Sequence, residues 1–269
     1  MQLLHRDCPL CGHDNGATRP LPWAPAPWVL RSCEQCDLIY VENPPVAEAL
    51  EADLAWEKTY AAEAEARRRR EPLLSALSGV GKRLRRRRNK FLKLALEHFR
   101  PGRILDVGCG SGHLLAQLPP EFIPFGVEVS RQLAAYAHEQ FARRGGRVIQ
   151  SPAVEGIEHF ESNSFDGLAM ISYLEHELQP KEALSAAMRV MRPGARLILK
   201  TPNAGSWNRA IRKEKWCGFR WPDHVNYFIP EVLVNAVQRA GFRIVLFGPT
   251  DWLPTSDNMW MVAEKPEKP

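Results

Sequence analysis

A glycine-rich turn between a buried strand and a helix is the feature that most constrains the fold of this chain. The stretch Ile104-Leu105-Asp106-Val107 runs directly into Gly108-Cys109-Gly110-Ser111-Gly112, and a helical pattern follows at 113–118. Glycines suit a place where the backbone must turn tightly and let a ligand approach without a Cβ in the way. A strand, such a turn and a helix form the first part of a βαβ unit, so we expect a nucleotide-like ligand above a parallel sheet.

The rest of the chain repeats this alternation. Apolar runs predict strands at 103–107, 123–129, 147–150, 166–171 and 195–200, and helical patterns lie between them at 113–118, 130–143 and 181–191. Strands alternating with helices predict an α/β fold with a parallel sheet covered on both faces. A helix at 230–240 then leads to strands near 242–248 and 258–264. No helix is expected between those two strands, so they should pair antiparallel at one edge.

Length and composition bound the organisation of the chain. At roughly 100–200 residues per domain, 269 residues predict one ordinary domain with an appendage. Hydrophobic residues at 45% and charged residues at 25% exclude a disordered or fibrous chain. No run approaches the ~20 apolar residues of a membrane span, and Cys8 precedes any apolar signal core. We therefore expect a soluble, cytoplasmic protein with three segments, at 1–45, 46–100 and 101–265.

Two cysteine pairs mark the first segment as a metal site. Cys8 and Cys11 form one CxxC unit, and Cys33 and Cys36 form the second. Four thiolates at this spacing suit tetrahedral Zn²⁺ and leave no open position for water, so the zinc should be structural. A proline-rich segment of 45 residues cannot bury a sufficient core alone, and metal binding would supply folding energy. The alternative, four free buried cysteines, explains neither pair.

A carboxylate stands at the end of the second strand of the α/β region. Glu128 lies 20 residues beyond Gly108, a spacing that suits an acidic group accepting hydrogen bonds from both ribose hydroxyls. A dinucleotide fingerprint would carry a third glycine at position 113, which is His113 here. The pattern is GxGxG with Asp106 two residues before the first glycine, although a nicotinamide-dependent oxidoreductase stays open as a less favoured alternative.

This pattern resembles the first motif of class I S-adenosyl-L-methionine-dependent methyltransferases. The resemblance covers about residues 90–265, and its further phrases arrive in the family's order: Gly126-Val127-Glu128-Val129-Ser130, Asn163-Ser164-Phe165-Asp166, Leu174-Glu175-His176, Arg189-Val190-Met191-Arg192-Pro193-Gly194, Lys200-Thr201-Pro202-Asn203 and Ala240-Gly241-Phe242. It implies a Rossmann-like sheet of seven strands, the last of them antiparallel.

The resemblance also implies roles for the residues around the glycine turn. Gly108, Cys109 and Gly110 would line the methionine portion of S-adenosyl-L-methionine, and Asp106 would order the turn and hold the amino group. The alternative for Asp106 is a simple turn cap. Glu128 would hold the ribose, with Val129 against the adenine.

The N-terminal ribbon joined to this fold is similar to a bacterial group of methyltransferases. In that group a sequence like Cys33-x-x-Cys36-Asp37-Leu38-Ile39-Tyr40-Val41 leads into a helical connector, and many members are associated with glycan or specialised-metabolite methylation. Asp37 replaces the glycine that usually follows the second pair, which predicts a slightly strained turn. A ribosomal-RNA methyltransferase group also joins a zinc ribbon to this fold and is the alternative.

The connector at 46–100 carries most of the positive charge. The net charge is +5, and residues 61–100 alone hold 13 basic and 4 acidic residues, with runs at Arg67–Arg70 and Lys82–Arg88. Clustered basic residues can contact phosphates. The runs fall in helices predicted over 47–71 and 82–99, where consecutive arginines point all around the axis, and they contain no aromatic residue for base stacking. We therefore favour a solvated or partner-facing helical face over RNA or an anionic small substrate.

The segment 201–228 should cap the acceptor pocket as a lid. It follows the fifth strand, and ligands lie beyond the carboxyl ends of parallel strands. Five basic and two acidic residues accompany its aromatic residues: Trp207, Trp216, Phe219, Trp221, Tyr227 and Phe228. Aromatic walls would suit a flat or sugar-like acceptor, including an anionic one, whereas simple lid packing is the alternative.

Two histidines are candidate catalytic bases. His176 follows the fourth strand and His224 lies in the lid. Ubiquinone-type O-methyltransferases resemble the chain at Leu174-Glu175-His176 and use such residues with a further acid to bind a divalent metal, but the further acidic position here is Ser172. The sequence thus predicts a methyltransferase that acts on a small or glycan-like acceptor at oxygen, without a catalytic metal. It leaves the acceptor and the oligomeric state open.

Overall fold

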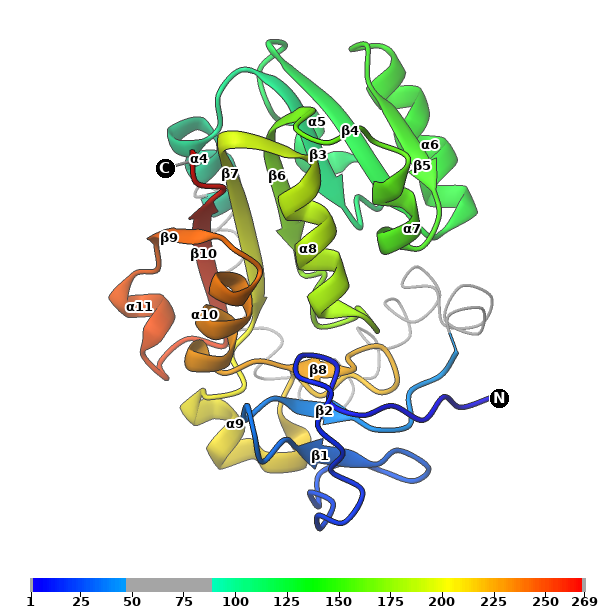
Figure 1. The fold of residues 1–269 in the computed structure, drawn as a ribbon, viewed down its shortest axis with the longest axis vertical. Helices are drawn as coiled ribbons and strands as arrows, with labels where there is room; N and C mark the ends of the chain where they lie inside the picture. The colour runs from blue at the N-terminus through cyan, green and yellow to red at the C-terminus, as the bar shows by residue number, and fades with distance from the viewer. Residues whose placement is uncertain (1, 47–88, 268–269) are drawn as a thin grey trace, which may run out of the picture.

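Seven strands form one mostly parallel sheet, as predicted. The computed structural model describes residues 2–46 and 89–267, and there the strand order is β5-β4-β3-β6-β7-β10-β9 (Figure 1). The strands are β3 (Gly102–Val107), β4 (Phe122–Glu128), β5 (Arg147–Gln150), β6 (Phe165–Ile171), β7 (Met191–Pro202), β9 (Arg243–Leu246) and β10 (Asn258–Glu264). Strand β10 runs antiparallel to both β7 and β9, which confirms the antiparallel pair predicted at the end of the chain.

Helices cover both faces of this sheet because alternate strand residues point to opposite sides. In β7, Leu197 and Leu199 belong to one buried cluster and Ile198 belongs to the other. One cluster lies under α7 (Ala153–Glu158), α8 (Pro180–Val190) and α10 (Pro230–Arg239). The second lies under α4 (Lys90–His98), α5 (His113–Ala116) and α6 (Arg131–Ala142). Among the described helices, none is long and apolar enough to cross a membrane.

Two details differ from the sequence prediction. The continuous helix predicted over 82–99 is wrong at residue 89, because Asn89 has extended backbone geometry and its side chain accepts the N–H of Leu92 as an N-cap. The helix therefore begins at Lys90. A short helix, α11 (Pro249–Trp252), also lies between β9 and β10, where none was expected. It starts with a proline, which suits the first helical position. The helix predicted over 47–71 and both arginine runs lie outside the described residues.

The N-terminal ribbon and the lid share one small sheet. Strands β1 (Leu30–Ser32) and β2 (Ile39–Val41) pair antiparallel, and β8 (Asn226–Tyr227) from the lid pairs with β2 as the third strand. Figure 1 shows β8 between the ribbon strands and the large sheet. The ribbon and the lid are thus joined by the pairing of β2 with β8. The sequence of neither segment predicted this pairing.

The same two segments share a hydrophobic core. Leu30 and Val41 of the ribbon pack with Trp216, Val225 and Tyr227 of the lid. A segment as short as the ribbon buries too little apolar surface alone. Its contact with the lid therefore provides burial in addition to any metal.

Candidate functional site

The glycine turn at the end of β3 adopts a conformation that side chains disfavour. Gly108, Gly110 and Gly112 all have positive φ, at 73°, 52° and 76°. A Cβ on Gly108 would lie 2.7 Å from the Tyr173 ring, whereas one on Gly110 would meet nothing within 4 Å. The turn is therefore closely packed at Gly108 and open at Gly110, which leaves a cradle for a ligand beside the backbone.

Glu128 connects the next strand end to this turn. Its carboxylate accepts hydrogen bonds from the backbone N–H of Gly110 at 2.7 Å and of Ser130 at 2.9 Å. Val129 follows, and its carbonyl accepts a hydrogen bond from the side chain of Gln150 at 2.9 Å. Glu128, Val129 and the turn thus lie together at the carboxyl ends of β3 and β4, where the sequence predicted them.

Cys109 contributes its backbone and not its thiol to the cradle. The thiol is buried against β4, because a Cβ added to Gly126 would lie 2.5 Å from the Cys109 Sγ. Burial, and then the charges of Asp106 and Glu128, raise the pKa of this thiol well above its usual value. The side chain is therefore a neutral packing group.

Two buried acidic side chains, Asp106 and Glu128, lie beside the cradle. Asp106 is 2% exposed and Glu128 is 9% exposed. Burial raises the pKa of Asp106 well above its usual value, and the charge of Glu128 raises it further. Two buried carboxyl groups favour a ligand with positive charge and disfavour a pyrophosphate. The residues present therefore fit the sulfonium and amino groups of S-adenosylmethionine better than a nicotinamide dinucleotide.

The two predicted histidines meet beyond the end of β6. Their ring centroids lie 4.6 Å apart and the rings are perpendicular. His176 lies one turn beyond Tyr173, since its N–H donates to the Tyr173 carbonyl at 2.9 Å, and Tyr173 packs on Gly108. His224 is buried, whereas His176 is partly exposed. Tyr173 thus connects the loop that carries His176 to the glycine turn, and His224 contacts the His176 ring.

Backbone carbonyls determine which nitrogen of each ring carries the proton. His176 Nδ1 lies 2.9 Å from the Asp223 carbonyl, and His224 Nδ1 lies 2.8 Å from the Gly218 carbonyl. A carbonyl oxygen can only accept, so each Nδ1 donates and each Nε2 keeps its lone pair. Burial lowers the pKa of His176 to about 4 and that of His224 well below its usual value. Both imidazoles are therefore neutral near pH 7.

Glu175 and Lys200 complete the surroundings of the histidines. Glu175 is buried, its Oε2 has no hydrogen-bond partner among the described residues, and burial raises its pKa to about 7. Lys200 donates to the Ser172 hydroxyl at 2.6 Å, and Ser172 has a left-handed φ of 55°. Backbone strain of this kind clusters at functional sites.

This cluster does not fit a divalent metal. Glu175, His176 and His224 could each offer one ligand atom, all within 4.8 Å of one another. However, the charges of Arg220 and Lys200 both act to lower the pKa of His176, and the same charges would oppose a bound cation. Lys200 also binds the Ser172 hydroxyl at the position where a further acid would be needed. We therefore assign no metal to these residues.

Arg6 ties the ribbon to both parts of the site. Its Nε donates to the Val41 carbonyl at 2.9 Å and its Nη1 to the Leu178 carbonyl at 2.9 Å. Its Nη2 donates to the Val225 carbonyl at 2.8 Å and to Asn226 Oδ1 at 3.1 Å. Burial lowers the pKa of this guanidinium to about 10. One buried side chain thus holds β2, the loop after β6 and the lid strand together.

Asn226 makes a second connection between the loop and the lid. Its side-chain amide donates to the carbonyls of Leu174 at 2.9 Å and of Glu177 at 2.6 Å. The loop that carries Glu175 and His176 is therefore held directly by β8.

The four ribbon cysteines converge as predicted. Cys8 and Cys36 Sγ lie 3.5 Å apart, as do Cys11 and Cys33 Sγ, and all four sulfurs lie within 4.8 Å of one another. Tetrahedral zinc with Zn–S bonds of ~2.3 Å needs sulfurs about 3.8 Å apart, so the donor set fits this ion. Asp37 has a left-handed φ of 61°, which agrees with the strained turn predicted there.

The lid aromatics serve packing more than they serve a pocket. Trp216, Tyr227 and Phe228 are buried, and Phe219 stacks on Trp221 with ring centroids 5.8 Å apart. All of these rings except Phe228 pack in the core between ribbon and lid, and Phe228 packs in the core of the large sheet, so the packing alternative holds for them.

Sequence reasoning missed several residues that organise this site. Glu175 lies inside the family phrase that contains His176, so proximity to His176 could have identified it. Lys200 lies in the family phrase Lys200-Thr201-Pro202-Asn203, so it could have been identified in the same way. Arg6 and Asn226 carry no local signal, because their roles depend on contacts between segments far apart in the chain.

Comparisons with known proteins agree with this architecture. A family model described as a methyltransferase domain matches residues 78–246, more than half of the chain. The O-methyltransferase cnsE of Penicillium expansum is 37% identical over 100 residues, which are 36% of this chain and 36% of that protein. A ubiquinone biosynthesis O-methyltransferase of Idiomarina loihiensis is 28% identical over 183 residues, covering 61% of this chain and 75% of that protein.

A solved S-adenosylmethionine-dependent methyltransferase from Archaeoglobus fulgidus shares the fold. It has a TM-score of 0.51 at 21% identity and covers 70% of this chain and 94% of that one. The match to the Penicillium protein spans only about a third of its length.

Replacing Arg6 tests whether its hydrogen bonds hold ribbon, loop and lid together. Arg6→Met keeps much of the stem but removes the four hydrogen bonds of the guanidinium, so we expect the free energy of unfolding to fall by about 3 kcal/mol or more in urea. The control is Arg19→Met, since Arg19 is exposed in the same ribbon; it should change stability by less than about 0.5 kcal/mol. Equal stability of the two variants would contradict the role given to Arg6.

Proposed function

The chain belongs to the family of class I S-adenosylmethionine-dependent methyltransferases, and from this premise we propose that it methylates an oxygen atom of a small or glycan-like acceptor. The observation that carries the proposal is His176, whose Nε2 keeps its lone pair one turn beyond the ring that packs on Gly108. A base at that place suits a hydroxyl, which must lose a proton as it is methylated. Two relatives with O-methyltransferase in their names support the choice of oxygen.

The cradle residues would hold the cofactor. Glu128 would exchange part of its hydrogen bonding with Gly110 and Ser130 for the ribose hydroxyls, and Val129 would contact the adenine. Asp106 would orient the amino group, and the backbone of Gly108, Cys109 and Gly110 would line the methionine chain. When bound, S-adenosyl-L-methionine supplies a methyl group already activated on a positively charged sulfur.

His176 would accept the proton of the acceptor at Nε2. Its Nδ1 stays bonded to the Asp223 carbonyl, which keeps the ring in the required tautomer. His224 is buried behind it and would act by positioning the His176 ring, with which it is in perpendicular contact. Because an activated methyl donor needs mainly in-line placement, positioning supplies much of the remaining catalysis.

The ribbon would bind one structural Zn²⁺ through its four cysteines. A site with four thiolates has no open position, so it supplies folding energy and no chemistry. Through β2, β8 and Arg6 the ion would also stabilise the lid that faces the acceptor. In this proposal the glycine turn and Glu128 bind the cofactor, whereas the zinc-bound ribbon stabilises the lid that covers the acceptor.

The described geometry gives less support to other functions. The arginine runs that would favour an RNA acceptor lie outside the residues that the structure describes. Position 113, where a dinucleotide fingerprint would carry its third glycine, is His113, which argues against an oxidoreductase.

The cofactor assignment predicts the binding preference of the purified protein. Calorimetry should detect S-adenosylhomocysteine binding and no NAD binding. Glu128→Ala should weaken S-adenosylhomocysteine binding by about 1.5–3 kcal/mol, the scale of hydrogen bonds to a charged group. Glu139→Ala, an exposed change on α6, should leave binding unchanged. NAD binding without an S-adenosylhomocysteine signal would refute the assignment.

The base assignment predicts both a rate and a pH profile. His176→Asn keeps a donor for the Asp223 carbonyl but removes Nε2, so the rate on a methylated member of a phenol and sugar panel should fall by about 10²–10⁴-fold. S-adenosylhomocysteine affinity should be preserved. Because the pKa of His176 is lowered to about 4, its neutral form persists as pH falls, and the limb of kcat/KM due to this base should lie near pH 4. A limb near pH 6.5 that His176→Asn abolishes would contradict the buried, low-pKa base.

The zinc assignment predicts one ion per chain in freshly reduced protein. Cys36→Ser should lose the zinc in elemental analysis, whereas Cys217→Ser should keep it, since Cys217 is exposed outside the ribbon. Loss of zinc should expose the ribbon to proteolysis and lower acceptor turnover, while S-adenosylhomocysteine binding survives. Absence of zinc from wild-type protein purified without chelator would refute the site.

A further inference from the structure

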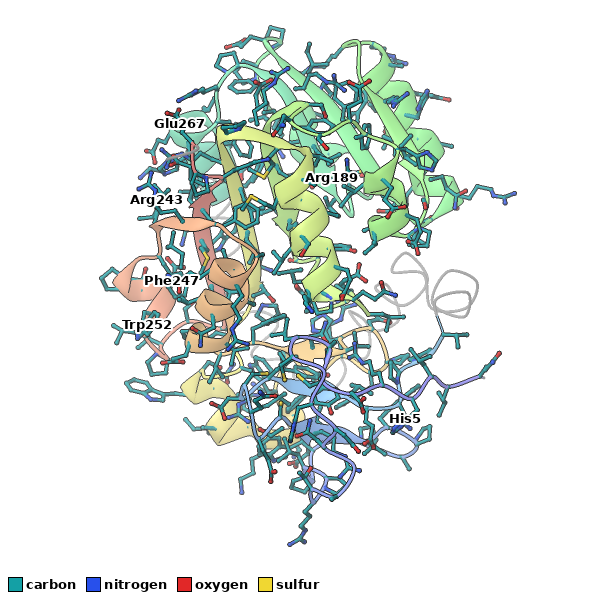
Figure 2. The ribbon with its side chains drawn as sticks, in the orientation of Figure 1. His5, Arg189, Arg243, Phe247, Trp252 and Glu267 are labelled. Atoms are coloured by element: carbon teal, nitrogen blue, oxygen red, sulfur yellow. The ribbon has the colours of Figure 1, made fainter. Side chains whose placement is uncertain are left out.

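Two short helices near the acceptor side leave apolar side chains exposed on one face. On α9 (Trp207–Arg212), Trp207 is 59% exposed and Ile211, one turn later, is 79% exposed. On α11, Trp252 is 44% exposed, and Leu253 just after it is 49% exposed. The helices adjoin, because the Trp207 N–H donates to the Pro254 carbonyl at 2.8 Å. We call Trp207, Ile211, Trp252 and Leu253 the apolar rim, and Figure 2 shows Trp252 at the outer edge of the molecule.

Exposed lysines border the apolar rim. Lys213 and Lys215 follow α9 directly and are exposed. Residues 207–215 include four basic residues and one acidic residue, Glu214. The segment therefore presents net positive charge next to its tryptophan.

The other carboxylates of this region are bound internally. Asp251 is buried and pairs with Lys90 Nζ at 2.9 Å. Asp257 accepts from the side chains of Ser206, Asn208 and Trp216 at 2.9, 2.7 and 3.1 Å. Because these acids are used inside the fold, the charge that accompanies the apolar rim at the surface is predominantly basic.

The residue types of the apolar rim and its lysines favour a lipid surface as the binding partner over a second copy of the chain. Tryptophan prefers the boundary between headgroups and acyl chains, and lysines beside it are attracted by anionic headgroups. A symmetric contact between two copies would instead bring both sets of lysines into one interface, where Glu214 is the one acidic residue of each 207–215 segment, so the net positive charge would oppose it. A tryptophan and an isoleucine one turn apart, bordered by lysines, match a shallow interfacial anchor.

We propose that the apolar rim, with Lys213 and Lys215, docks the protein on anionic lipid bilayers. The anchor would be peripheral, with Trp207 and Ile211 inserted at headgroup depth and the lysines facing the headgroups. Because α9 follows the carboxyl end of β7, docking would place the acceptor side of the molecule toward the bilayer. That orientation suits an acceptor carried by a lipid. This last step rests on the proposed function, whereas the docking itself does not.

Vesicle sedimentation with the full chain tests the proposal. Wild-type protein should sediment with phosphatidylcholine vesicles that contain about one third phosphatidylglycerol and much less with pure phosphatidylcholine. The double variant Trp207→Ala/Ile211→Ala should lose at least about tenfold in partitioning, as an anchor of buried apolar area would. Lys213→Ser/Lys215→Ser should also lose about tenfold or more, and added salt should reproduce that loss in wild type.

A matched control removes exposed apolar side chains elsewhere. Leu96 is 51% exposed and Tyr136 is 56% exposed, on α4 and α6. Leu96→Ala/Tyr136→Ala should sediment like wild type. All variants should bind S-adenosylhomocysteine normally, which shows that they are folded and separates this test from that of the enzymatic proposal.

Three results would overturn the proposal. The first is no sedimentation of wild type with anionic vesicles at low salt. The second is an equal loss in the apolar-rim variant and in the control. The third is a dimer in analytical ultracentrifugation that Trp207→Ala/Ile211→Ala dissociates while vesicle binding is unchanged, which would assign the apolar rim to a second copy of the chain.

Discussion

The arrangement of ribbon, loop and lid depends on one buried guanidinium. Arg6 donates to the carbonyls of Val41, Leu178 and Val225, which lie in three segments with no sequence proximity. Burying a charge is costly, and the four hydrogen bonds of the guanidinium offset part of that cost. Because each segment supplies an acceptor, the geometry of all three is specified at once. The loop with His176 therefore cannot move independently of the ribbon, and a segment that does no chemistry becomes part of how the site is held.

Charge separates the two halves of the site. Asp106 and Glu128 place acidic groups under the cradle, whereas Lys200 and Arg220 act on the histidine side. A cationic donor is therefore favoured at the cradle, while protonation of His176 is opposed by burial and by the neighbouring positive charges. The negative charge at the cradle and the positive charge near the histidines therefore suit different functions. One half suits a charged cofactor, and the other keeps an imidazole neutral, as the proposed role of His176 as a base requires.

The large sheet could be predicted from sequence because its signals are local. Continuous apolar runs, as at 197–199, predict strands that are buried on both faces, and glycines with positive φ mark the turn at 108–112. The four cysteines were likewise predicted to meet, since their spacing alone specifies a cluster. The lid was harder. Its aromatic content gave no indication that Trp216 and Tyr227 pack against the ribbon, and β8 is a two-residue strand defined only by its partner β2. Contacts between distant segments leave no pattern in a single sequence.

The burial of the lid aromatic side chains affects which acceptor the site could bind. Because Trp216 and Tyr227 are buried between ribbon and lid, and Phe228 is buried in the core of the large sheet, these side chains are not available as walls for a flat ligand. Polar side chains act on or lie close to His176, among them Glu175 and Lys200, and the Oε2 of Glu175 is buried without a hydrogen-bond partner among the described residues. An unpaired buried oxygen is costly unless a donor reaches it. A hydroxyl-bearing acceptor could supply such a donor, whereas an aromatic hydrocarbon surface could not. This polarity supports the sugar-like acceptor that we propose over a purely aromatic one.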